Sequence, residues 1–231
     1  MQRYSIREFV TATVQRDEAR DMFELESPHL LEVNLDGRIK AKTGAMIGYT
    51  GDVNFTREGI MEQGIGTLLK KAVSGEGMTL MKVDGRGRVY LADKGKRVTI
   101  LALEGETIFV NGNDILAFED CLESEITMMR RISGMLAGGL FNIRLTGKGR
   151  LAMTTHYEPV TLLVTPGAPV FTDPNATVAW SGSLSPEIVT NITLRTLIGR
   201  GSGEAIQLKF DGTGWVVLQP YEEAYFQAAS V

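Results

Sequence analysis

The sequence predicts an all-β fold, and two observations support this prediction. Apolar and polar residues alternate over short runs, as in Leu31, Val33 and Leu35, and a period of two is typical of half-buried strands. Glycine-containing turn signals such as Asp84-Gly85 separate these runs about every eight to twelve residues, a spacing typical of all-β domains. We therefore expect many short strands and one short helix.

An internal repeat indicates how these strands are organised. Residues 77–126 align with residues 139–188 at a shift of 62 without a gap, giving 14 identities in 50 positions. Self-similarity at a fixed period indicates one structural unit that is used more than once. We expect residues 1–231 to form a single domain that contains these two repeats.

A third copy of the unit is visible in two pieces. Residues 208–216 repeat the pattern of 81–89, and Ile47 aligns with Ile108 at a shift of 61. We therefore expect a third unit that is split between residues 203–220 and residues 30–55. In this interpretation the first and last strands of the chain pair with each other, which closes the sheets and removes open edges.

Glycines are prominent at equivalent places in these units. We assign them to tight hairpin turns, because glycine adopts a positive φ without steric cost. The glycines assigned in this way are Gly85, Gly87, Gly147, Gly149, Gly212 and Gly214.

Helix signals are few. Residues 64–73 show apolar positions at helical spacing with two lysines on the opposite face, and Ser74-Gly75 follows as an end signal. Ile6, Phe9 and Val10 fit an N-terminal helix, but residues 9–14 also fit a strand. Both assignments are left open for this segment.

Bulk properties favour a cytoplasmic protein. The net charge is −4, which does not indicate a polyanionic partner. A single cysteine, Cys121, excludes an intrachain disulfide and fits a reducing compartment. The N-terminal residues show no apolar run of signal-peptide length, and no stretch approaches the roughly 18 apolar residues of a membrane span.

Candidate catalytic residues are sparse, and we expect neither an enzyme nor a cofactor. His156 and Glu158 lie two residues apart, which would place them on one face of a strand, so they are the weak candidates for a metal site. Such sites need more ligands, and polar positions at a strand end or turn are the favoured interpretation. Cys121 aligns with Ser183 in the other repeat, which favours a structural position over a nucleophile. The glycine-rich residues 199–203 offer backbone N–H groups to an anion, but a linker is the favoured interpretation.

Basic residues flank the repeated glycines at equivalent positions. They form the candidate anion contact of the chain, and a ring of such charges is the basis of an alternative function in nucleic-acid binding. These residues are Arg86, Arg88, Lys148 and Arg150. We do not expect nucleic-acid binding, because the chain is acidic overall and shows no aromatic-basic stripe on which bases stack.

A methionine-rich connector lies between the two full repeats. Residues 128–136 contain three methionines and two arginines. Methionine fills irregular gaps in cores and also forms adaptable binding surfaces. The connector is therefore either part of the core or a surface for another subunit or a membrane partner.

Several motifs resemble one known family. In order along the chain, they resemble signatures of the altered-inheritance-of-mitochondria family, and the resemblance extends over about residues 22 to 221. The motifs are residues 42–47, 75–78, 134–142, 203–208 and 217–220. The resemblance implies a bacterial member with a fold like that of the tryptophan RNA-binding attenuation protein, a pseudo-barrel or β-sandwich of internally repeated strands. It implies no established activity and supplies no catalytic residues.

Together these observations predict a non-enzymatic scaffold or binding protein that forms a homo-oligomer and has an unidentified protein partner. Two alternatives remain: a nucleic-acid-binding β protein, and a small-molecule or metal enzyme that uses His156 and Glu158 in the mouth of the barrel. Peripheral membrane association is left open, with no residue pattern in its favour.

Overall fold

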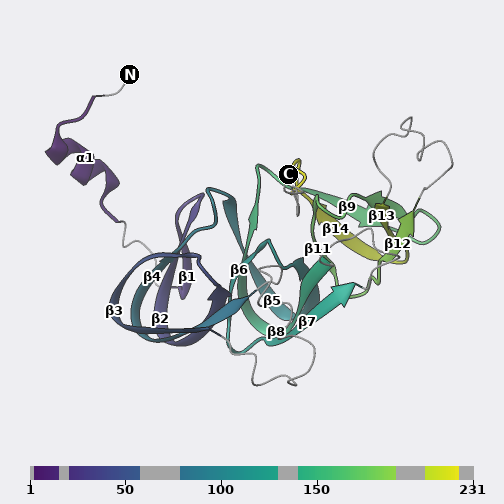
Figure 1. The fold of residues 1–231 in the computed structure, drawn as a ribbon, viewed down its shortest axis with the longest axis horizontal. Helices are drawn as coiled ribbons and strands as arrows, with labels where there is room; N and C mark the ends of the chain where they lie inside the picture. The colour runs from purple at the N-terminus through teal and green to yellow at the C-terminus, as the bar shows by residue number, and fades with distance from the viewer. Residues whose placement is uncertain (1–2, 16–20, 58–78, 130–139, 191–205, 224–231) are drawn as a thin grey trace, which may run out of the picture.

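The computed structural model describes residues 3–15, 21–57, 79–129, 140–190 and 206–223, and Figure 1 shows its ribbon. The described residues form one short helix and many strands, which confirms the predicted all-β fold class. In chain order the elements are α1 (Ile6–Thr13), β1 (Phe23–Ser27), β2 (Leu30–Lys42), β3 (Met46–Arg57), β4 (Leu80–Leu91), β5 (Arg97–Asn111), β6 (Ile115–Glu119), β7 (Glu123–Met129), β8 (Leu140–Thr155), β9 (Val160–Val164), β10 (Val170–Thr172), β11 (Thr177–Ser181), β12 (Glu187–Thr190), β13 (Ile206–Phe210) and β14 (Gly214–Leu218).

Eleven of the strands belong to one large sheet. Its order is β3-β4-β2-β6-β8-β5-β11-β14-β9, with β1 paired to β2 and β7 paired to β8 outside this path. Three further strands form a small sheet in the order β10-β13-β12. The path of the large sheet has two ends, so the sheet does not close into a barrel.

Three strand pairings in these sheets repeat the same register. An aromatic residue of β3, β6 and β11 lies opposite an aliphatic residue of β4, β8 and β14, and the register shifts just before that aromatic residue in all three pairings. The opposite pairs are Tyr49 and Val89, Phe118 and Leu151, and Trp180 and Val216. Strands β3, β6 and β11 therefore begin equivalent segments of three successive units.

The predicted pairing between the first and last strands is wrong. β2 pairs with β1, β4 and β6, whereas β14 pairs with β11 and β9. The physical reason is that the half unit at each end of the chain already pairs with the full unit next to it. β2 pairs with β4 and β14 pairs with β9, in the same way as β5 and β8 join the two full units. β3 and β13 accordingly lie at opposite ends of the long axis (Figure 1). That residues 1–231 form one domain stays a prediction.

The alignment of Ile47 with Ile108 is also wrong. Ile39 of β2 lies opposite Glu119 of β6, and Ile108 of β5 lies opposite Ser181 of β11, so Ile39 is the structural counterpart of Ile108. The equivalent strand is therefore β2, which precedes β3 in the chain.

The assignment of the repeated glycines to hairpin turns needs correction. Gly85 and Gly87 lie inside β4, and Gly147 and Gly149 lie inside β8, so only the Gly212–Gly214 region joins two strands. Gly85 has φ +128°, and a Cβ there would lie 2.1 Å from the Asp52 carbonyl oxygen of β3. Positive φ inside a long strand thus allows the close approach of two backbones, which is a different use of the same property.

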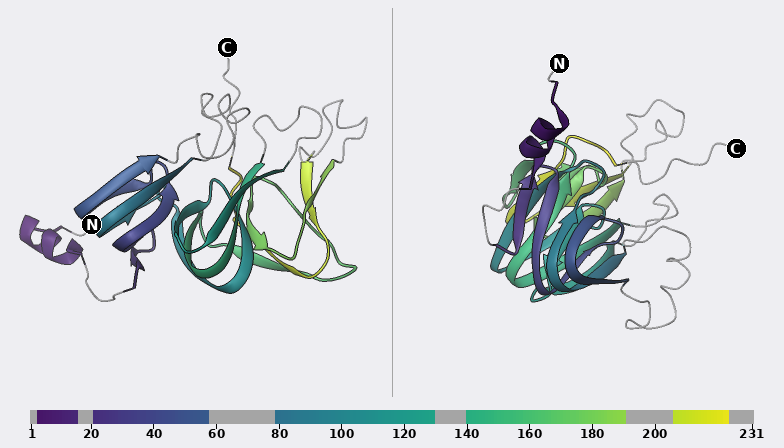
Figure 2. Two further views of the ribbon diagram at one scale, coloured as in Figure 1. Left: turned by 90° about the horizontal axis from the view of Figure 1, so that it is seen from below. Right: turned by 90° about the vertical axis from the view of Figure 1, so that its left-hand side faces the viewer.

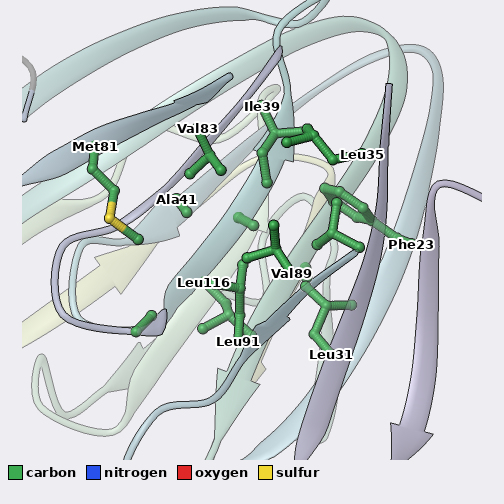
Figure 3. Packing of buried hydrophobic residues seen from close by; sticks show 14 of the residues in the cluster. Phe23, Leu31, Leu35, Ile39, Ala41, Met81, Val83, Val89, Leu91 and Leu116 are labelled. Carbon is green, nitrogen blue, oxygen red and sulfur yellow. The ribbon is translucent and has the colours of Figure 1, made fainter. Parts of the chain in front are cut away.

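The cores of the molecule follow the units. One cluster of buried apolar residues fills the space between β1, β2, β3 and β4 and reaches Leu116 of β6, and Figure 3 shows this packing. A second cluster lies among β5, β6, β8 and β11, and a third among β9, β11, β13 and β14. Each full burial of a residue such as Ile39 or Phe118 contributes about 1.5–3 kcal/mol of transfer free energy.

Helix α1 stands apart from the sheets (Figures 1 and 2). Ser5 caps it, because its hydroxyl accepts from the Glu8 N–H while the Glu8 carboxylate accepts from the Ser5 N–H, and this capping box decides the open choice in favour of a helix. In the described part of the chain no helix is long and apolar enough to cross a lipid bilayer. The predicted helix at residues 64–73, residues 199–203 and most of the methionine-rich connector lie outside the described residues.

Candidate functional site

The two histidines, which are far apart in the sequence, line one pocket. Its volume is about 350 Å³, and its lining consists of His29, Gly95, Arg97, His156, Tyr157 and Glu158. Arg97 and Glu158 form an ion pair with a distance of 3.2 Å between nitrogen and oxygen, and both side chains are substantially exposed. The Glu158 carboxylate is thus engaged by a guanidinium at the surface of the pocket.

His156 is held on its other side by residues from the C-terminal segment. Its backbone N–H donates to the Gln219 side-chain oxygen at 2.7 Å, and its ring lies against Tyr221 with centroids 4.0 Å apart. Burial and the positive charge of Lys96 lower the pKa of His156, so its imidazole is neutral at pH 7. The carboxylate close to its Nε2 atom, at 3.5 Å, belongs to Glu223.

His156 and Glu158 thus line the same pocket, while the carboxylate nearest the His156 ring is that of Glu223, and a metal site at His156 and Glu158 stays a prediction. Among the residues that the structure describes, no group of three or more histidine, cysteine, aspartate or glutamate side chains is arranged to hold a metal ion. Nothing in the sequence could have indicated Glu223, because it lies far from His156 along the chain and outside the repeats.

A cluster of buried charges lies behind the pocket. Lys96 is 3% exposed and its ammonium lies 2.9 Å from Asp114, 3.8 Å from Asp93 and in contact with Glu223. Lys42 joins the cluster through Asp93, at 2.7 Å. These five residues come from β2, from the connections that precede β5 and β6, and from the segment after β14, so the cluster ties distant parts of the chain together.

Burial and the neighbouring charges together set the protonation of this cluster. Burial raises the pKa of Asp114 to about 7, with Lys96 acting in the opposite direction. Burial alone would lower the pKa of Lys96, but the charges of Asp114 and Glu223 outweigh that effect and raise it. Lys96 is therefore a permanent cation that contacts the carboxylates of Asp93 and Glu223, and that of Asp114 when Asp114 is ionised. This is the arrangement of a structural ion cluster.

The four basic residues of the candidate anion contact are distributed over β4 and β8. Three of them face carboxylates: the distances are 2.9 Å for Arg86 and Asp36, 3.6 Å for Arg88 and Glu32, and 3.1 Å for Arg150 and Asp21. Lys148 is exposed on β8. Pairing of the three guanidiniums with carboxylates lowers the positive potential that these residues offer to a polyanion.

Cys121 lies at the surface beside β8. Its thiol lies 3.3 Å from the Lys148 carbonyl oxygen and 3.6 Å from the Glu119 carboxylate, which are the two acceptors within reach of its single S–H. Partial burial and the negative charge of Glu119 raise the pKa of the Cys121 thiol. A raised pKa lowers the fraction of thiolate at neutral pH, which makes Cys121 a poor nucleophile.

The open end of the large sheet at β3 carries apolar residues that are exposed. Met46, Ile47 and Tyr49 are 37%, 62% and 49% exposed. The equivalent residues of β6 and β11 are 0–3% exposed: Ile115, Leu116 and Phe118 in β6, and Thr177, Val178 and Trp180 in β11. Three positions that are buried in two units are therefore largely apolar and exposed in the first.

The family described as mitochondrial biogenesis AIM24 matches residues 23–221. The chain belongs to the AIM24 family. Its fold is similar to that of the protein SPYM3_0169 from Streptococcus pyogenes, known from an X-ray crystal structure, with a TM-score of 0.68 and 23% identity over 88% of this chain and 94% of that chain. No curated protein matches the sequence.

Every strand in the described part of the chain lies within the segment shared with the AIM24 family, whereas α1 lies outside it. The structural neighbour supports the fold alone at this level of identity. The candidate functional features of this AIM24 protein are thus the histidine pocket, the ion cluster behind it, and the exposed edge of β3. The exposed apolar edge of β3 was not predicted from the sequence, although an alignment of β3 with β6 and β11 could have indicated it.

Proposed function

We propose that this AIM24 protein is a non-enzymatic scaffold that forms a homo-oligomer and presents its β surface to another protein. The observation that supports the proposal is the exposed apolar edge of β3, whose equivalents in β6 and β11 are buried under neighbouring strands. Exposed apolar residues at a sheet edge favour association with a further strand.

The charged and polar groups of the chain are consistent with this role. In the buried ion cluster around Lys96, two ammonium groups face three carboxyl groups, and the cluster links the connections next to β5 and β6 to the C-terminal segment. Such a cluster stiffens the frame on which an interaction surface is displayed. The proposal assigns no reaction and no cofactor to the chain.

Size-exclusion chromatography with multi-angle light scattering tests the proposal. The expected mass is a multiple of the 25.3 kDa chain, and Tyr49→Glu is expected to shift the assembly toward the monomer because it places a charge on the edge. Ile126→Glu is the matched control, since Ile126 is 42% exposed on β7, a strand that pairs with β8 and not with β3.

A mass of 25.3 kDa for the wild-type chain at high micromolar concentration would contradict the proposal. An equal shift toward monomer in Ile126→Glu and Tyr49→Glu would also contradict it, because the effect would then come from added charge and not from the edge.

A further inference from the structure

The open edge of β3 has two covered counterparts inside the chain, and they show what kind of strand covers it. β2 covers β6 with Lys40 opposite Phe118, and β5 covers β11 with Phe109 opposite Trp180. The Lys40 ammonium lies 5.8 Å from the centroid of the Phe118 ring, and the rings of Phe109 and Trp180 stack with centroids 5.4 Å apart. Tyr49 is the residue of β3 at this position, and in the described chain it has no covering strand.

β10 resembles the two strands that cover a neighbour. β2, β5 and β10 share one feature: on one side, each pairs with a strand that places a basic residue opposite the position in question. The opposite pairs are Lys40 and Lys82, Phe109 and Arg144, and Phe171 and Lys209. β10 is an end strand of the small sheet, so among the described residues no strand pairs with its second edge. The chain therefore has a strand of the covering type without a strand to cover, and β3 without a cover.

We infer that β10 of one copy of the chain pairs, antiparallel, with β3 of a second copy. The register follows from the two internal junctions. The expected opposite pairs are Val170 and Thr50, Phe171 and Tyr49, and Thr172 and Gly48. This inference rests on the proposed homo-oligomer and specifies its contact.

Side-chain exposure agrees with this pairing. Phe171 is 51% exposed and Tyr49 is 49% exposed, although each belongs to a position that faces an aromatic or a long side chain inside the chain. Both are aromatic, as are Phe109 and Trp180 at the stacked internal junction. Two aromatic residues at opposite cross-strand positions attract each other.

The contact is head-to-tail, because β3 and β10 are different surfaces of the same chain. Each copy has one of each, so binding one neighbour through β3 leaves β10 free for another. Such a heterologous contact produces a ring where the rotation between copies closes, and a filament where it does not. A pairing of two β3 edges with each other would instead produce a closed dimer.

Disulfide cross-linking between two single-cysteine variants tests the contact. Tyr49→Cys and Phe171→Cys are each made in a Cys121→Ser background, mixed in equal amounts and oxidised. Directly opposite residues of an antiparallel pair have Cα atoms about 4.5–5.5 Å apart, which lies within the range that a disulfide spans. The expected result is a covalent dimer in the mixture and in neither variant alone.

The matched control replaces Phe171→Cys with Ile126→Cys, another exposed apolar strand residue, and no dimer is expected. If either variant fails to fold, as judged by circular dichroism, the neighbouring pair Thr50→Cys and Val170→Cys serves for the same measurement.

A dimer formed by Tyr49→Cys alone would overturn the inference, since two β3 edges would then be in contact. The inference would also be overturned if the wild type is an oligomer by light scattering but neither the mixture of Tyr49→Cys with Phe171→Cys nor that of Thr50→Cys with Val170→Cys gives a covalent dimer. The proposed homo-oligomer would stand in that case. A wild-type monomer at high micromolar concentration would overturn both.

Discussion

Replacement of the buried Asp114 by asparagine makes a quantitative prediction about stability. Asp114 is 0% exposed, and burial raises its pKa from 3.8 to about 7. Between these two pH values the folded chain holds a proton that the unfolded chain releases, so the free energy of unfolding falls as the pH rises and becomes level above about pH 7. Three pKa units correspond to about 4 kcal/mol.

Asp114→Asn removes this dependence while it keeps the shape of the protonated side chain and an oxygen that accepts from Lys96. The variant and the wild type should differ little below about pH 4, apart from the effect of the amide itself. As the pH rises toward 8, the variant should gain about 4 kcal/mol relative to the wild type, because ionisation of a buried carboxyl costs more than its ion pair returns. The neighbouring charges of Lys96, Asp93, Lys42 and Glu223 are present in both chains.

Urea unfolding followed by circular dichroism, at several pH values between about 4.5 and 8 and at one protein concentration, measures the difference. Asp120→Asn is the control, since it makes the same chemical change at an exposed residue. A stability difference between wild type and Asp114→Asn that stays constant over this pH range would refute the reasoning, because it would mean that Asp114 is ionised in the fold throughout.

Three further substitutions have defined outcomes. Lys96→Met should lower the free energy of unfolding by about 3–5 kcal/mol at pH 8 in urea titrations, because it leaves Asp114 without its main counter-charge. The loss should shrink at pH 5, where Asp114 is protonated, and an equal loss at both values would contradict this account. Gly85→Ala should lower stability by about 1–3 kcal/mol in thermal unfolding, because its φ of +128° is strained for alanine and the Cβ meets the Asp52 carbonyl oxygen. Cys121→Ser should change stability by less than about 0.5 kcal/mol, since the side chain is exposed, and a larger loss would assign the thiol a packing role.

The strands and the repeat could be predicted because both are recorded in local sequence patterns. Alternation at Leu31, Val33 and Leu35 reflects which side chains face the core, and all three are buried in the structure. The lack of gaps reflects equivalent segments at the same spacing in both repeats, although β5 is one strand where the second repeat has β9 and β10. These signals depend only on residues close together in the chain, so no knowledge of tertiary structure was needed.

Strand partners could not be predicted in the same way. Pairing of β2 with β4 or of β14 with β9 depends on which edges are already occupied, and a repeated sequence is compatible with closure within one chain and with open ends. The positive φ of Gly85 has the same sequence signal in a hairpin turn and in a bent strand. The sequence therefore indicated the correct residues but not their use.

The polar cluster was equally beyond sequence reasoning. Lys96 and Glu223 are separated by more than half of the chain, and neither belongs to a recognised motif. Their contact arises because the segment after β14 returns toward the connection between β4 and β5. The sequence indicated only the nearby pocket residues His156 and Glu158, and Glu158 forms an ion pair with Arg97.

The arrangement of half units around two full units has a consequence for how such proteins change in length. β2 and β3 supply the late half of a module, and β13 and β14 supply the early half. The pairings of β2 with β4, β5 with β8 and β9 with β14 therefore each join consecutive modules. Removing one complete period, or duplicating it, would leave the same pair of terminal surfaces on a shorter or longer body. Relatives of different size could therefore keep one mode of self-recognition while the spacing between their outer faces varies in whole steps.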